Sequence, residues 1–317
     1  MAGKVTGQTG LLGRVSTWIE RLHDEVTGFF TQLDRGGAFR EDRWDRAGGG
    51  GGVSRVLTDG VTFEKAGVNR SAVDGALDPQ LAQRIGARVS ALEPLTFSAA
   101  GLSLVIHPRS PMVPTVHLNV RYFEIARSGG ELIDAWFGGG TDLTPTYPFP
   151  EDAKHFHCTL KAVCDRHDPG FYPRFKTWCD HYFVNTHRGE ERRGIGGIFF
   201  DHLRAGESGL SLEQLFEFVT GVGEILPAAY GPLVERRRDL SFGERERHFQ
   251  LIRRGRYAEF NLVHDRGTLF GLQTGARIES VLMSLPPLVA WDYSPVYQPD
   301  SFEAELLAML EPRDWAG

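Results

Sequence analysis

Apolar and polar positions alternate strictly along residues 115–123, and this period of two predicts a β-strand with one buried face. The apolar positions are Val116, Leu118, Val120 and Tyr122. The opposite face carries His117, Asn119 and Arg121: a titratable group, an amide and a cation suited to carboxylates. A solvated strand can carry such residues by chance, but three of them in a row are typical of the floor of a binding site.

Residues 102–108 form a second short alternating run. Its two faces carry Ser103, Val105 and His107 on one side and Leu102, Leu104 and Ile106 on the other. Polar residues capable of chemistry thus occur at matched spacing on two successive strands. This repetition favours a site over a chance arrangement.

Apolar residues three or four positions apart predict several amphipathic helices. We expect them over residues 17–33, 151–166, 172–187 and 211–226, the last beginning with a capping box of Ser211 and Gln214. Asp78 and Pro79 are typical of an N-cap and a first helical residue, and they predict another helix before the two strands. Asp300 and Glu303 predict the start of a final helix that ends at Leu310.

Further strands are predicted at residues 194–200 and 257–263. A turn at residues 265–267 then predicts that residues 269–272 return as the second arm of a hairpin. The strands occur in adjacent runs, without the regular β-α-β order or the G-x-G-x-x-G motif of dinucleotide-binding folds. We therefore expect an α+β fold, with a large, mainly antiparallel sheet flanked by helices on both faces.

The length of 317 residues suits one domain, which we expect over residues 15–317 after a flexible N-terminus of residues 1–14. The formal net charge of -6 argues against a nucleic acid partner, because phosphate binding normally leaves a basic surface. No run approaches the roughly 18 apolar residues of a membrane span, and residues 1–13 lack the apolar stretch of a secretory signal. A cytoplasmic protein is expected. Its three cysteines form no C-x-x-C pair and are expected to be free thiols: Cys158, Cys164 and Cys179.

Two local patterns keep alternative interpretations open. The glycine run Gly48–Gly52 lacks the Gly-Lys-Ser/Thr ending of a phosphate loop, and it suits either a loop that covers a ligand or a linker. Arg188, Arg192 and Arg193 form the basic cluster that we retain as a candidate for binding an anion. The alternative for this cluster is a solvated face.

Several longer blocks of the sequence resemble the oxygen-dependent coproporphyrinogen III oxidases. The blocks are residues 101–124, 136–145 and 187–200, supported by residues 54–69 and 257–287. They include Pro-Thr-Val-His-Leu-Asn-Val-Arg-Tyr-Phe-Glu and Trp-Phe-Gly-Gly-Gly-Thr-Asp-Leu-Thr-Pro, and they occur in the family's order. The resemblance covers about residues 15–312.

The resemblance implies an enzyme of haem biosynthesis that oxidatively decarboxylates two propionates of coproporphyrinogen III to vinyl groups, giving protoporphyrinogen IX with dioxygen as oxidant. It implies no organic cofactor, and no flavin, nicotinamide, haem or iron–sulfur motif is visible. It also implies a homodimer. A porphyrin-binding protein without catalysis is the alternative, as is a histidine-rich metal-dependent hydrolase if the resemblance is set aside.

The resemblance also implies roles for individual residues. His117 matches the family's proton donor, and the positions that match substrate contacts are Ser103, Asn119, Val120, Arg121, Gly275, Ala276 and Arg277. We expect Asp142 to bind pyrrole N–H groups and to stabilise the cationic macrocycle, the alternative being a turn or N-cap aspartate. A histidine suits proton transfer at working pH.

A divalent metal is a separate expectation, because four histidines match positions given as metal ligands in bacterial members: His107, His117, His157 and His187. Their spacing fits no zinc signature, and the alternative for each is a packed or surface histidine. The chain also departs from the family pattern in places. Ala276 stands where a second glycine is common, His202 replaces a second aspartate after Asp201, and His264 stands where an aromatic residue is common.

Overall fold

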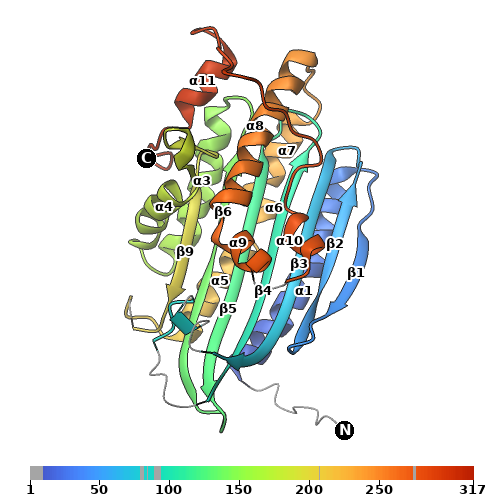
Figure 1. Ribbon diagram of the computed structural model, residues 1–317. Coiled ribbons are helices and arrows are strands. Elements are labelled where there is room, and N and C mark those ends of the chain that lie inside the picture. Colours follow the sequence, from blue (N-terminus) through green and yellow to red (C-terminus); the bar gives the residue numbers. More distant parts are fainter. Residues whose placement is uncertain (1–9, 79–81, 84, 89–93, 207, 274–275) are drawn as a thin grey trace.

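The computed structural model describes residues 10–78, 82–83, 85–88, 94–206, 208–273 and 276–317. Its centre is a seven-stranded antiparallel sheet with the strand order β1-β2-β3-β4-β5-β6-β9 (Figure 1). The strands are β1 (Arg40–Asp45), β2 (Gly50–Thr58), β3 (Phe63–Leu77), β4 (Leu95–Pro108), β5 (Thr115–Arg127), β6 (Leu132–Thr144) and β9 (Gly197–Leu203). The first six strands are neighbours in both sequence and space, and each pairs antiparallel with the next.

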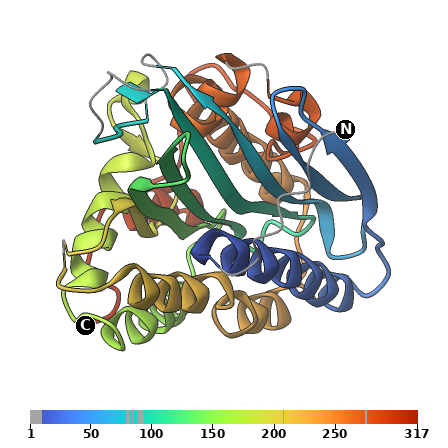
Figure 2. The ribbon, with the colours of Figure 1, turned by 90° about the horizontal axis from the view of Figure 1, so that it is seen from below.

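Helices cover both faces of the sheet (Figures 1 and 2). One face, which we call the back face, carries α1 (Leu11–Asp34), α3 (Pro150–Asp165), α5 (Leu212–Gly223), α6 (Leu226–Ala229) and α7 (Gly231–Arg237). The front face is covered in part by α8 (Glu244–Val263), α9 (Arg266–Gln273) and α10 (Ile278–Leu282). The expected α+β fold, with a mainly antiparallel sheet between helices, is confirmed.

The remaining elements lie at one edge of the sheet and near the end of the chain. The helix α4 (Phe171–Tyr182) packs against the edge strand β9. A two-stranded ribbon follows it, formed by β7 (Val184–Asn185) and β8 (Glu191–Arg192) around the 3-10 helix Thr186–Arg188. The last helix is α11 (Phe302–Met309).

The back face forms the main hydrophobic core. Leu104 on β4 and Leu118 on β5 are paired in register and fully buried. They belong to the same buried cluster as Phe30 on α1 and Phe218 on α5. Each such side chain stabilises the fold by about 1.5–3 kcal/mol relative to an exposed one. The apolar positions of the alternating run 115–123 are therefore the ones that β5 packs into the core.

Two predicted strands are wrong. Residues 257–263 form the last turns of α8, and residues 269–272 lie within α9, so no hairpin exists there. Tyr257 and Phe260 are buried and three positions apart, which is helical spacing that a short apolar window does not distinguish from a strand. The predicted turn at residues 265–267 joins two helices instead.

Other boundaries need smaller corrections. Gly50–Gly52 belong to β2, where all three pair with β3 and Gly51 and Gly52 also pair with β1, so this part of the glycine run is neither a loop nor a linker. The helix expected over residues 172–187 ends at Tyr182, and the helix from Ser211 ends at Gly223 with its capping box confirmed. The cap of the final helix is Ser301 rather than Asp300. The helix predicted from Asp78 and Pro79 falls largely outside the described residues.

Candidate active site on the front face

The register of the sheet aligns polar side chains across the middle of the front face. Ser54 on β2 pairs with Asn69 on β3, and Ser103 on β4 lies between Asn69 and Asn119 on β5. Residues paired in register point to the same face, so these four side chains form one row, which we call the polar row. Ser54 Oγ donates to Asn69 Oδ1 at 2.9 Å. Ser54 is buried and lies 2.8 Å from Ser280 Oγ on α10, whereas Ser103 and Asn119 are partly exposed, so the half of the row on β4 and β5 is open to a ligand.

His117 lies one position further along the same face of β5, where it is paired in register with Asp142 on β6. The distance from His117 Nδ1 to Asp142 Oδ1 is 2.8 Å. Arg193 donates to both oxygens of Asp142, at 2.9 and 2.7 Å. The side chain of His117 is 19% exposed, whereas those of Asp142 and Arg193 are each 2% exposed. The imidazole is thus the part of this network that faces solvent.

Arg193 is held in an aromatic enclosure. Its guanidinium carbon lies 4.1 Å from the ring centre of Phe183 and 4.4 Å from that of Tyr257. It also donates to Asn261 Oδ1 at 3.1 Å. Burial alone would penalise the cation, but Asp142 more than compensates and raises the pKa of Arg193. Such a buried pair is fixed in place, because removing either partner would leave an uncompensated charge.

Asp142 is ionised in this environment. Burial favours the neutral acid, but Arg193 and His117 together hold the pKa of the Asp142 carboxyl below its ordinary value. An ionised carboxylate only accepts hydrogen bonds, so Nδ1 of His117 must carry a proton and donate it to Asp142. In the neutral imidazole, Nε2 then carries the lone pair. This fixed tautomer makes His117 a suitable acid–base group.

The position of Asp142 excludes one of the two sequence-based interpretations. It lies inside β6, so it is neither a turn residue nor an N-cap. It lies behind His117, with its oxygens engaged by His117 and Arg193, so its direct contact with pyrrole N–H groups stays a prediction. The arginine cluster divides: only Arg193 reaches this network, whereas Arg188 binds Glu259 and Arg192 binds Glu311.

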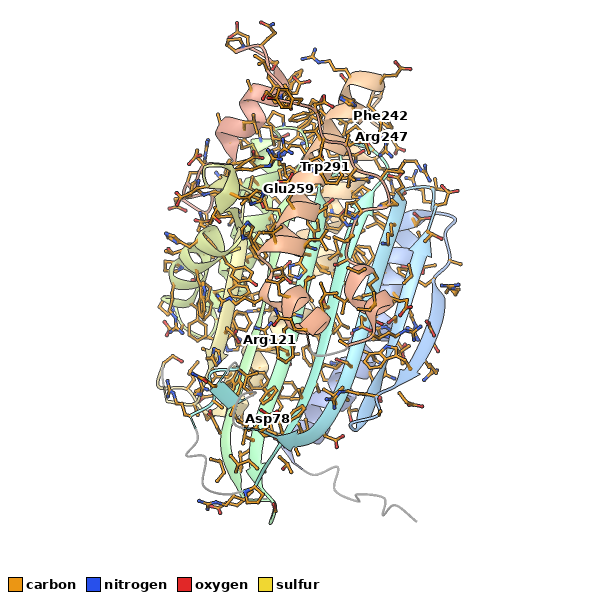
Figure 3. The ribbon with its side chains drawn as sticks, in the orientation of Figure 1. Asp78, Arg121, Phe242, Arg247, Glu259 and Trp291 are labelled. Carbon is orange, nitrogen blue, oxygen red and sulfur yellow. The ribbon has the colours of Figure 1, made fainter. Side chains whose placement is uncertain are left out.

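Arg121 lies on the other side of the polar row, on the lower half of the front face (Figure 3). It donates to Asn119 Oδ1 at 2.8 Å and pairs with Asp201 at 3.0 Å. Its side chain is 38% exposed. Gly138 makes room for this pair, because a Cβ there would lie 2.7 Å from both Arg121 Nε and Asp201 Oδ1. Val120 points to the buried back face, so only its backbone can contribute to a site on the front.

Arg277 marks the opposite end of the polar row. It forms ion pairs with Asp42 on β1 and with Glu279, and Asp42 is paired in register with Ser54. Four strand spacings separate β1 from β5, which is about 19 Å. Ala276 is exposed, and Gly275 lies outside the described residues. Two arginines therefore flank a polar floor wide enough for a large carboxylated ring.

The four histidines expected to bind a metal do not share a site. His107 is buried, with Nε2 2.8 Å from Ser284 O, and burial lowers its pKa well below the ordinary value. His157 is fully buried between Tyr172 and the backbone of Ile195, and burial lowers its pKa to about 3.

His187 also lies away from His117 and Asp142. It is exposed and interacts with His264 and Glu259. Among the residues that the structure describes, no group of three or more His, Cys, Asp or Glu side chains could hold a metal ion. The residues present therefore do not fit a common metal centre, and we assign the metal no step.

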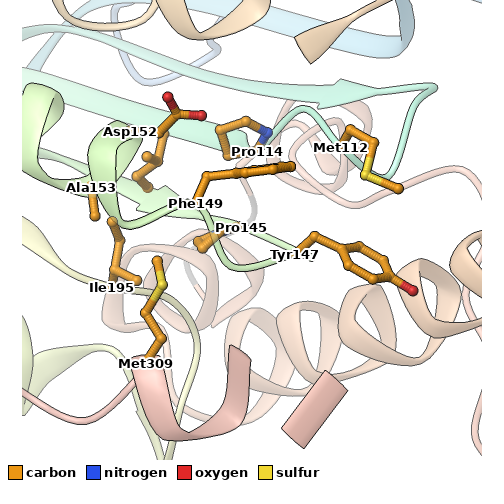
Figure 4. A pocket seen from close by; sticks show the side chains of 10 residues that line it. Met112, Pro114, Pro145, Tyr147, Phe149, Asp152, Ala153, Ile195 and Met309 are labelled. Atoms are coloured by element: carbon orange, nitrogen blue, oxygen red, sulfur yellow. The ribbon is translucent and has the colours of Figure 1, made fainter. Parts of the chain in front are cut away.

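Two hollows elsewhere contain none of the residues expected to act on a substrate. One is a small apolar cavity lined by residues that include Met112, Tyr147, Phe149 and Met309 (Figure 4). Its carboxylate, Asp152, is paired with Arg236 and Arg237. The other is an open cleft beside α11, lined by residues that include Arg245, His248, Tyr297 and Glu303. The candidate chemistry is therefore on the front face of the sheet.

The fold and the site are typical of an α+β enzyme that combines an acid–base histidine with separate cations for a small molecule with several carboxylates. The model of the coproporphyrinogen III oxidase family matches residues 14–315. The chain belongs to this family, which acts in haem biosynthesis by oxidative decarboxylation. In the described part of the chain, no helix is both long and apolar enough to cross a membrane.

Proposed function

We propose that the chain is the oxygen-dependent form of coproporphyrinogen III oxidase and converts two propionates of its substrate to vinyl groups. For each propionate, the bond to the carboxyl carbon breaks and CO2 leaves. A proton leaves the carbon attached to the ring, and two electrons pass to dioxygen, which takes up two protons. The observation that carries the proposal is the position of His117, which shares the front face with Arg121 and with the ion pair between Arg277 and Asp42 on β1.

His117 is the proton-transfer group in this proposal. Its Nδ1 is committed to Asp142, so Nε2 exchanges a proton with the substrate. The positive charge that forms on the ring when Nε2 gains a proton is stabilised by the Asp142 carboxylate. Arg193 keeps that carboxylate ionised and fixed, so the imidazole retains one orientation throughout the reaction.

Arg121 and Arg277 bind and orient the substrate carboxylates. Each is paired with an acidic residue of the protein, Asp201 or Asp42, at the place that a propionate would take. Ser103 and Asn119 lie between them and offer hydrogen bonds to the substrate. One arginine–carboxylate contact contributes about 1.5–3 kcal/mol, so two of them can hold the ring in register with His117.

The proposal uses no organic cofactor, since an electron-rich porphyrinogen can itself deliver electrons to dioxygen. A bound divalent metal is a separate expectation. Metal analysis of the purified protein, with activity measured before and after chelation, tests it. Full activity in protein with no bound metal would remove the metal from the mechanism. A cytoplasmic location also stays an expectation.

We further propose that the chain forms a homodimer. Apolar side chains remain exposed on α8, α9 and α10 and in the segment that follows: Leu262, Val263, Phe270, Leu272, Ile278, Leu288 and Trp291. A grouping of this kind is typical of a protein interface rather than of a solvated surface. Sedimentation at several protein concentrations measures the assembly directly.

One assay tests the reaction. Coproporphyrinogen III is incubated with the protein in air and under strict anaerobiosis, and the product, the CO2 released and the dioxygen consumed are measured. We expect a divinyl tetrapyrrole only in air. Binding without turnover in air would instead indicate a porphyrin-binding protein, and equal turnover without dioxygen would contradict oxygen dependence.

A further inference from the structure

His202 connects the carboxylate that holds Arg121 to a separate segment of the chain. It lies on β9 next to Asp201, and its ring stacks on Trp136 with 5.2 Å between ring centres and an interplanar angle of 26°. Its φ of 51° is uncommon for a residue with a side chain. The backbone N–H of His202 donates to Asp201 Oδ1 at 2.9 Å. Both its backbone and its ring are therefore fixed beside the Asp201 carboxylate.

The ring of His202 also fastens residues 85–88 to the sheet. The distance from His202 Nε2 to Ile85 O is 2.7 Å. Two further contacts hold the same segment: Arg204 donates to Gly86 O at 3.1 Å, and the backbone N–H of Arg88 donates to Asp134 at 3.0 Å. Hydrogen bonds to Ile85, Gly86 and Arg88 thus attach residues 85–88 to β6 and β9.

The contact with Ile85 fixes the tautomer of His202. A backbone carbonyl oxygen only accepts hydrogen bonds, so Nε2 must carry a proton. In the neutral ring, Nδ1 therefore carries the lone pair, and it lies 3.8 Å from Asp201 Oδ2. A lone pair facing a carboxylate is unfavourable, whereas the same nitrogen with a proton would attract it. The ring thus has two opposite effects on Asp201, depending on its charge.

Asp201 Oδ2 is also the oxygen that pairs with Arg121 Nη2 at 3.0 Å. We propose that His202 is a positioning residue whose charge sets how firmly Asp201 holds Arg121, and thereby how strongly the front face binds a substrate carboxylate. When His202 is protonated, Asp201 is shared between two cations and Arg121 is freer to bind the substrate. The inference rests on the proposed role of Arg121, and it adds a residue and a pH dependence to it.

The other charged groups around His202 do not produce the same effect. Arg204 on β9 and Asp134 on β6 are paired with each other in buried positions. Arg88 enters through its backbone, which donates to Asp134. Burial favours the neutral form of Asp201, but Arg121 and then His202 hold its pKa below the ordinary value. Asp201 is therefore held in its ionised form.

The test is the affinity for coproporphyrin III, the oxidised ring with the same four carboxylates, which binds without turnover. Its dissociation constant is measured by fluorescence titration between pH 6 and pH 8. We expect His202 to make wild-type protein bind about threefold to fivefold more tightly at pH 6 than at pH 8. This is the size of effect expected from one partly exposed charge pair. This component should disappear in His202→Asn, because asparagine tolerates a positive φ but gains no charge.

Asp201→Asn and the double variant complete a cycle. Asp201→Asn should also abolish the pH dependence that His202 causes, since His202 then has no carboxylate to draw away from Arg121. The double variant should show the same pH dependence of binding as either single variant. An unchanged pH dependence in His202→Asn would overturn the inference, as would its retention in Asp201→Asn.

Two controls accompany the cycle. His202→Phe, which keeps an aromatic ring on Trp136, shows whether stacking alone matters, and thermal unfolding of each variant checks the fold. Arg121→Gln tests the role of Arg121 independently of the role of His202. If this variant binds the porphyrin as tightly as wild type at every pH, Arg121 does not bind a substrate carboxylate.

Discussion

The two faces of the sheet are built from the same strands, yet they have opposite properties. On the back face, Leu104 and Leu118 are fully buried against helices. On the front face, their sequence neighbours Ser103 and His117 are partly exposed and polar. Because side chains alternate along a strand, adjacent residues can serve stability and chemistry separately. The comparison predicts that substitutions one residue apart will affect different measurements.

The front face is itself divided. Around His117, the partners Asp142 and Arg193 are buried beneath α8, so the acid–base group has a rigid, dry support. Around Arg121, the ion pair with Asp201 is partly exposed and can be exchanged for a ligand. A fixed proton-transfer group beside exchangeable cations suits a reaction at one point of a large, charged substrate.

The largest effect is expected at His117. His117→Gln removes the proton-transfer group while keeping a similar size and polarity, so kcat should fall by about 10²- to 10⁴-fold. The free energy of unfolding should change little, because the side chain is partly exposed and lies outside the core. Steady-state turnover and urea unfolding give the two quantities. Near wild-type turnover in a folded His117→Gln protein would remove His117 from the mechanism.

Leu118→Ala, one residue further on, should show the reverse. Truncating this fully buried side chain leaves a cavity in the core and should lower the free energy of unfolding by about 2–5 kcal/mol. The kcat per folded molecule should remain within about twofold of wild type under conditions where the variant is folded. Urea unfolding gives the first value, and turnover corrected for the folded fraction gives the second. A kcat loss as large as that of His117→Gln would show that the two faces are not independent.

Arg121→Gln tests the exchangeable part of the front face. Loss of one arginine–carboxylate contact, about 1.5–3 kcal/mol, should raise KM about 10- to 100-fold with a smaller change in kcat. The matched control is Arg43→Gln on the edge strand β1, which makes the same charge change at an exposed position. If both variants raise KM equally, the effect comes from net charge rather than from a specific contact.

The sequence predicts the central part of the fold well, and for a physical reason. Over residues 116–122 of β5, apolar side chains are buried on one face and polar side chains are partly exposed on the other, so alternation alone identifies both the strand and the row of His117, Asn119 and Arg121. The same kind of analysis fails at Tyr257 and Phe260. The helix α8 is buried over much of its surface, so its sequence lacks the separate apolar and polar faces that identify a helix with one solvated side. Burial on several sides removes the periodic signal.

The supporting network could not be predicted in the same way. Arg193 is 51 residues from Asp142 in the sequence, and its enclosure by Phe183 and Tyr257 depends on how three elements meet. The sequence contains only a weak signal, the basic cluster to which Arg193 belongs, and cannot tell it from Arg188 and Arg192. Pairings of this kind depend on tertiary packing, which local patterns do not encode.

The smallest expected effect compares two histidines rather than two faces. His157 is fully buried and its pKa is lowered to about 3, so the folded protein does not protonate it in mild acid, whereas the unfolded chain does below about pH 6.5. The unfolded state therefore binds more protons, and stability must fall as the pH falls from 6.5 to 5, by about 1–2 kcal/mol from this residue. His157→Gln can still form hydrogen bonds to Tyr172 and Ile195 but does not titrate. In urea unfolding, this variant should show a smaller decrease of the free energy of unfolding between pH 6.5 and pH 5. A control substitution of the exposed His181 on α4 should leave the decrease unchanged. An unchanged slope in His157→Gln would mean that the histidine is not held neutral, and the contrast with the solvent-facing His117 would then rest on geometry alone.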